Sequence, residues 1–81
     1  MITKDSIESA YCFFHQKRKL YVETQKDYVK DHIEWTIADY VEQMNPELYQ
    51  KLSNGREHYL QDHTTFRADI DDAVAQLEKM A

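Results

Sequence analysis

The sequence predicts an all-α fold, a small antiparallel bundle of three or four helices that forms a single domain over residues 1–81. The chain has only one glycine and one proline, whereas small β-sandwiches, barrels and α/β folds need these residues at many turns. Apolar side chains also recur every three or four positions along most of the chain. That spacing places them on one face of a helix.

The first helical pattern begins near Asp5, which together with Glu8 has the form of a capping box. It continues in a stripe of residues that would share one helix face: Ile7, Tyr11, Phe14, Arg18 and Tyr21. A second stripe of the same period follows, made of Val29, Ile33, Ile37, Tyr40 and Met44. No residue between the two stripes forces a helix to stop.

Two arrangements fit this region. In the first, one unbroken helix runs over residues 5–44, as indicated by side chains spaced by sevens at Ile7, Phe14, Tyr21, Tyr28 and Trp35. That helix would be ~60 Å long, about twice the diameter of a compact chain of this size. It would project beyond the core of one chain, so a dimer would be needed to cover it. In the second, Thr24 caps a new helix after a short joint at residues 22–25.

The rest of the chain contains clearer local signals. Asn45 and Pro46 predict the start of a helix, because asparagine is a good cap and proline suits the first helical position. Gly55 suits the left-handed residue that ends this helix and begins a hairpin. Residues 56–62 are predicted to be helical, and Thr65 to cap a last helix. The last helix has an apolar stripe formed by Phe66, Ile70, Ala73, Val74, Leu77 and Met80.

Composition excludes several classes of protein. The longest apolar run, residues 10–14, is far shorter than the ~20 residues that a membrane span needs, and the N-terminus lacks the apolar stretch of a signal peptide.

The aromatic neighbours of the lone Cys12 predict a buried thiol. One unpaired cysteine fits a reducing compartment, so we expect a cytoplasmic protein. Basic residues predominate over residues 1–30 and acidic residues over 31–81, which fits either antiparallel packing of the first helix against the last or a head-to-tail dimer.

The sequence predicts neither catalysis nor a cofactor. No Asp or Glu has a histidine three places later, which is the spacing used by helical bundles that bind two metal ions. Only His58 and Asp62, one helical turn apart, could face one ion, and no dedicated metal site is expected. The aromatic surroundings of Cys12 disfavour a reactive thiolate. A single glycine excludes the usual phosphate-binding loop.

Nucleic-acid binding is also disfavoured. The run Lys17-Arg18-Lys19 spreads over ~200° of a helix surface and therefore makes no single patch. The net charge of −5 further opposes contact with a phosphate backbone.

The aromatic residues, which include six tyrosines and one tryptophan, predict an interaction surface, because Tyr and Trp are enriched at the centres of interfaces. We expect a small non-enzymatic module that forms a homodimer or binds another protein. Its contact surface is predicted to contain Phe14, Tyr21, Tyr28 and Trp35. The alternative is an acidic regulator that blocks a basic partner, such as a nucleic-acid-binding protein, through Asp62, Asp69, Asp71 and Asp72.

Overall fold

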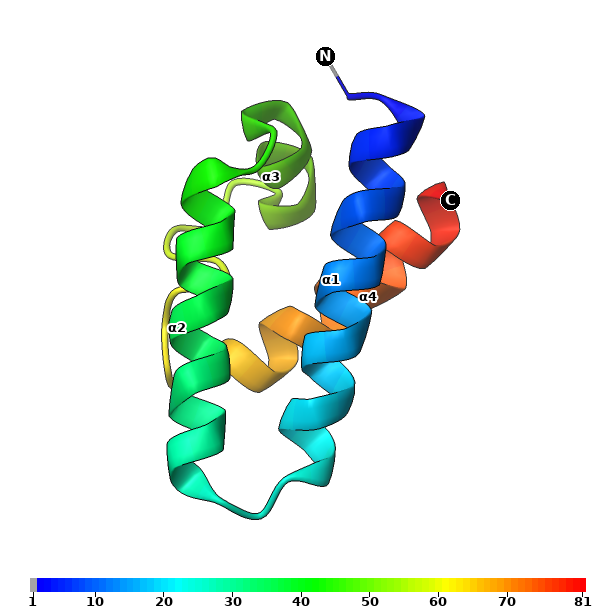
Figure 1. Ribbon diagram of the computed structural model, residues 1–81. Coiled ribbons are helices and arrows are strands. Elements are labelled where there is room, and N and C mark those ends of the chain that lie inside the picture. Colours follow the sequence, from blue (N-terminus) through cyan, green and yellow to red (C-terminus); the bar gives the residue numbers. More distant parts are fainter. Residues whose placement is uncertain (1) are drawn as a thin grey trace.

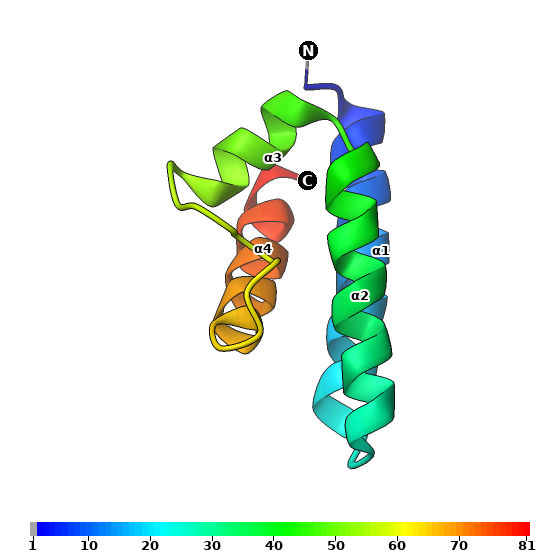
Figure 2. The same ribbon diagram turned by 90° about the vertical axis from the view of Figure 1, so that its left-hand side faces the viewer.

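A computed structural model describes residues 2–81 and confirms the all-α fold, with four helices and no strand in that range. Figure 1 shows an antiparallel pair, α1 and α2, while Figure 2 shows that α3 and α4 both lie on one side of this pair. The chain measures 37 × 23 × 19 Å. The helices are α1 (Lys4–Glu23), α2 (Asp27–Gln43), α3 (Pro46–Ser53) and α4 (Phe66–Met80).

The chain breaks between α1 and α2, which excludes the unbroken helix over residues 5–44. Thr24 has an extended backbone, and its N–H donates to the Leu20 carbonyl at 2.9 Å, so Thr24 ends α1. The residue before α2 is Lys26. Thr24 therefore closes one helix and does not begin the next, although its Oγ1 accepts a hydrogen bond from the Lys26 N–H at 3.3 Å.

The starts of α1 and α3 are fixed by side-chain caps. The predicted capping box of Asp5 and Glu8 is wrong, because Thr3 and Ser6, two positions earlier, form the reciprocal pair. The backbone N–H of each residue donates to the hydroxyl of the other, at 3.0 and 3.1 Å. Asn45 caps α3 as predicted. Its Oδ1 accepts hydrogen bonds from the backbone N–H groups of Glu47 and Leu48, at 2.9 and 3.3 Å.

The prediction of helix over residues 56–62 is wrong, since this segment forms turns. α3 ends as expected, with Asn54 and Gly55 both in the left-handed region, but no helix follows directly to complete a helical hairpin. His58 and Leu60 also have positive φ angles, of 57° and 64°, which no right-handed helix contains. The turns are held by α3 and α4, because the Tyr49 hydroxyl donates to the Tyr59 carbonyl at 2.7 Å and the Leu60 N–H donates to Asp69 Oδ2 at 2.9 Å.

The core lies between the α1–α2 pair and the α3–α4 pair. α4 crosses α1 obliquely and runs in the opposite sense (Figures 1 and 2). Arg18 Nε lies 2.6 Å from Asp71 Oδ1 and joins these two helices, as in the first of the two arrangements that fit the charge distribution. The largest fully buried side chains are Phe14, Ile37, Leu48, Leu52, Tyr59, Leu60, Phe66, Ile70 and Leu77.

No helix between residues 2 and 81 combines the length and the apolarity that crossing a membrane requires.

Candidate functional site

The structure separates the four side chains that the sequence assigns to an interface. Phe14 and Tyr21 are 0% and 9% exposed and lie in the core, whereas Tyr28 and Trp35 are 68% and 66% exposed. The buried pair is therefore unavailable to a second chain. The cause is the break at Thr24, because spacing by sevens keeps residues on one face only within a continuous helix.

Tyr28 and Trp35 belong to a stripe on the outer face of α2, opposite the buried face of that helix. We call Tyr28, His32, Trp35 and Asp39 the outer α2 stripe, because residues at this spacing are neighbours on a helix surface. The His32 and Trp35 rings stack with centroids 6.3 Å apart. The Lys26 ammonium lies over the Tyr28 ring, 5.9 Å from its centroid. Among the described residues, α3 and α4 cover only the other side of the α1–α2 pair (Figure 2).

A second candidate site is an open pocket of about 320 Å³ where α2 meets the loop that precedes α4. Glu34 is its central side chain. The Glu34 oxygens lie 2.9 and 3.1 Å from His63 Nδ1, and Oε2 accepts a hydrogen bond from the Tyr21 hydroxyl at 3.4 Å. The contact between Glu34 and His63 ties the loop to α2. The pocket is lined by Tyr21, Asp27, Lys30, Asp31, Glu34 and His63.

Glu34 also sets the electrostatics of this pocket. Its hydrogen bond and its negative charge raise the pKa of His63. Burial, followed by the charge and hydrogen bond of Glu34, raises the pKa of Tyr21. Asp31 lies one turn earlier on α2, and ligand atoms of Asp31, Glu34 and His63 all lie within 4.8 Å of one another. These three groups are thus placed to share a proton or a cation.

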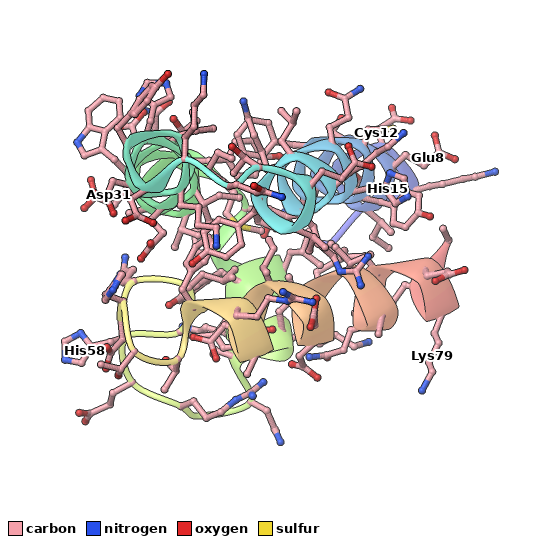
Figure 3. All side chains as sticks on the ribbon, turned by 90° about the horizontal axis from the view of Figure 1, so that it is seen from below. Glu8, Cys12, His15, Asp31, His58 and Lys79 are labelled. Carbon is pink, nitrogen blue, oxygen red and sulfur yellow. The ribbon has the colours of Figure 1, made fainter. Side chains whose placement is uncertain are left out.

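Sequence reasoning missed this cluster because His63 lies 29 residues from Glu34, and no local spacing connects them. The pair that it considered, His58 with Asp62, depends on a helix that is not formed there. Asp62 instead accepts hydrogen bonds from the backbone N–H and the hydroxyl of Thr64, at 2.9 and 2.8 Å. In Figure 3, His58 projects from the loop, and Asp31 lies on α2 at the same edge of the molecule.

The aspartates assigned to a basic partner bind groups of their own chain. Asp69 is buried and accepts hydrogen bonds from the Leu60 N–H and the Thr65 hydroxyl, at 2.9 and 3.1 Å. Asp72 Oδ2 accepts three hydrogen bonds of 2.8 Å, from Arg56, Tyr59 and Gln76. Asp71 pairs with Arg18 and Arg67. These contacts weaken the case for an acidic docking surface.

Asp71 and Asp72 should make the fold sensitive to acid. Partial burial raises the pKa of each carboxyl, but hydrogen bonds from Arg18 and Arg67 to Asp71, and from Arg56 and other donors to Asp72, outweigh it and leave both pKa values lowered. A pKa that is lower in the folded than in the unfolded chain stabilises the fold above about pH 4. That stabilisation is lost as the pH falls through the pKa of the carboxyl in the folded chain.

We therefore expect the free energy of unfolding, measured by urea titration, to fall as the pH drops from about 5 to about 2. Each carboxylate should contribute no more than about 1 kcal/mol, because both pairs are partly exposed. Asp72→Asn should flatten the pH dependence in this range. An unchanged slope in that variant would show that Asp72 is not one of the titrating groups.

The prediction that the Cys12 thiol is buried is wrong, because this side chain is exposed. Its aromatic neighbours in the sequence point to other sides of α1, and Phe13 stacks on Tyr40 with ring centroids 4.1 Å apart. Figure 3 shows Cys12 and His15 close together on α1.

A comparison with protein-family models finds no match for this chain. Comparisons with curated proteins and with solved structures find no similar protein either.

Proposed function

We propose that this chain is a small non-enzymatic interaction module that forms a homodimer through the outer α2 stripe. The observation that carries the proposal is the exposure of Tyr28 and Trp35, each about two-thirds accessible, on one face of a single helix. Large aromatic rings contribute most when a partner removes them from water. They also supply a large share of the residues on which protein–protein binding depends.

The charges beside the stripe support a second copy of the chain as the partner. Lys26 lies at the Tyr28 end, and Asp39 lies one turn beyond Trp35. A two-fold symmetric contact brings the same surface of both copies together. With the two α2 helices antiparallel, Tyr28 of one copy would face Trp35 of the other, and Lys26 would approach Asp39. Both copies would then satisfy the same contacts.

The test is the dissociation constant of the dimer, measured by sedimentation equilibrium over a wide range of concentration. Replacing Tyr28 and Trp35 together with alanine should raise this constant by about thirtyfold or more, as loss of a central aromatic contact does. Leu20→Ala is the matched control, because Leu20 is also an exposed apolar residue but lies on α1. This control should leave the constant unchanged.

The antiparallel arrangement makes a further requirement. Lys26→Glu and Asp39→Lys should each weaken the dimer, and the double variant should recover much of the loss. A chain that stays monomeric at every concentration would refute self-association, and the outer α2 stripe would then be a contact surface for a different protein. An equal effect of Leu20→Ala would refute the assignment of the surface.

We also propose a cytoplasmic location. Its support is the exposed thiol of Cys12, the lone cysteine of the chain, because a reducing compartment keeps such a thiol free.

A further inference from the structure

We propose that Asp31, Glu34 and His63 form a binding site for a divalent transition-metal ion, and that Zn²⁺ fits it best. The site is separate from the outer α2 stripe and does not depend on self-association. Asp31 and Glu34 are three residues apart on α2, so their carboxylates share one side of the helix. His63 approaches from the loop before α4 and adds a nitrogen ligand. Two elements distant in sequence thus bring two oxygen ligands and one nitrogen ligand together.

The distances suit a small ion after a modest movement. The ligand atoms lie within 4.8 Å of one another. Tetrahedral zinc with bonds of about 2.1 Å separates its ligand atoms by about 3.4 Å. The widest of these separations must therefore shorten by at most ~1.4 Å. His63, with a side chain 77% exposed, has room to make this movement, whereas Glu34, at 14%, is held in place.

The surroundings of the three ligands resemble those of a metal site in two respects. The Tyr21 hydroxyl donates to Glu34 Oε2, and such outer hydrogen bonds orient a ligating carboxylate. The open pocket of about 320 Å³ leaves space for water to complete the coordination. Its lining also favours a cation, because Asp27, Asp31 and Glu34 are opposed by the single ammonium of Lys30.

The choice of metal follows from the ligands. Imidazole and carboxylate together suit Zn²⁺, whereas Mg²⁺ prefers oxygen ligands in an octahedron. In the metal-free chain, His63 Nδ1 contacts both oxygens of Glu34, and the ion would replace the proton that joins them. Because the ligating nitrogen must offer a lone pair, zinc binding competes with protonation of His63, and in the neutral ring the proton would stay on the other nitrogen. The ion would then clamp the loop of residues 54–65 to α2.

Isothermal titration calorimetry of the tag-free chain with ZnCl₂ at about pH 8, above the ordinary pKa of histidine, tests the proposal. We expect one Zn²⁺ per chain. His63→Ala and Asp31→Asn should each weaken binding by at least about tenfold, and MgCl₂ should give no binding. Zinc should also raise the melting temperature of the wild-type chain, because an ion that binds only the folded state stabilises it. The His63→Ala chain should show a smaller rise.

Two controls make the result specific. His58→Ala removes another exposed histidine of the same loop and should leave the affinity unchanged. Cys12→Ala removes a thiol that lies beside His15 on α1 and could itself bind zinc (Figure 3). Undiminished binding in Cys12→Ala supports the proposed site, whereas loss of binding there overturns it. The proposal also fails if His58→Ala weakens binding as much as His63→Ala does, or if the wild-type chain binds no zinc.

Discussion

Phe14→Ala should lower the free energy of unfolding by about 3–5 kcal/mol, the usual loss for a buried aromatic ring. Phe14 is fully buried in the core of a single chain. Its ring meets the Tyr40 ring edge-on with centroids 5.4 Å apart. Truncation would remove these contacts and leave a cavity that neighbouring helices can fill only in part. Urea unfolding followed by circular dichroism gives the measurement.

Trp35→Ala is the matched comparison, because the sequence assigns both residues to one contact surface. Trp35 is 66% exposed, so its removal should change stability by less than about 0.5 kcal/mol at concentrations where the chain is monomeric. The two variants together separate a core role from an interface role. A loss at Trp35 as large as the loss at Phe14 would contradict the burial of these residues and the assignment that follows from it.

The sequence predicts the parts of the fold that depend on interactions between residues close together in the chain. The scarcity of glycine and proline favours helices throughout the chain. α3 begins at Asn45 and Pro46, because the Asn45 side chain caps the first turn and Pro46 occupies the first helical position. The apolar stripe of α4 is buried as expected, apart from the half-buried Met80. In each case the determining contacts are made by residues close in sequence.

The parts that it does not predict depend on distant contacts. Residues 56–62 leave the helical conformation because Asp69 and Asp72 on α4 accept hydrogen bonds from this segment. The Asp31–Glu34–His63 cluster likewise needs the loop to turn back toward α2. The burial of Phe14 and Tyr21 has a related cause, since a short break at Thr24 changes which residues share a face.

The role of Asp69 in that segment can be tested directly, because Asp69→Ala should lower the free energy of unfolding by about 2–3 kcal/mol. Asp69 is only 7% exposed, and its Oδ2 accepts hydrogen bonds from the Leu60 N–H at 2.9 Å and from the Thr65 hydroxyl at 3.1 Å. Alanine would leave the buried Leu60 N–H without its acceptor, and an unpaired buried donor costs about 1–3 kcal/mol. Loss of a negative charge from the first turn of α4 adds a further ~0.3–1 kcal/mol.

Asp69→Asn separates these two contributions, because the amide oxygen can still accept from Leu60 while the charge is removed. It should therefore recover more than half of the loss seen with alanine. Amide hydrogen exchange provides a local measurement, in which the Leu60 N–H should exchange faster in Asp69→Ala than in Asp69→Asn. Equal protection of that N–H in the wild-type and Asp69→Ala chains would mean that Asp69 does not hold the loop. The left-handed backbone at Leu60 would then need another support.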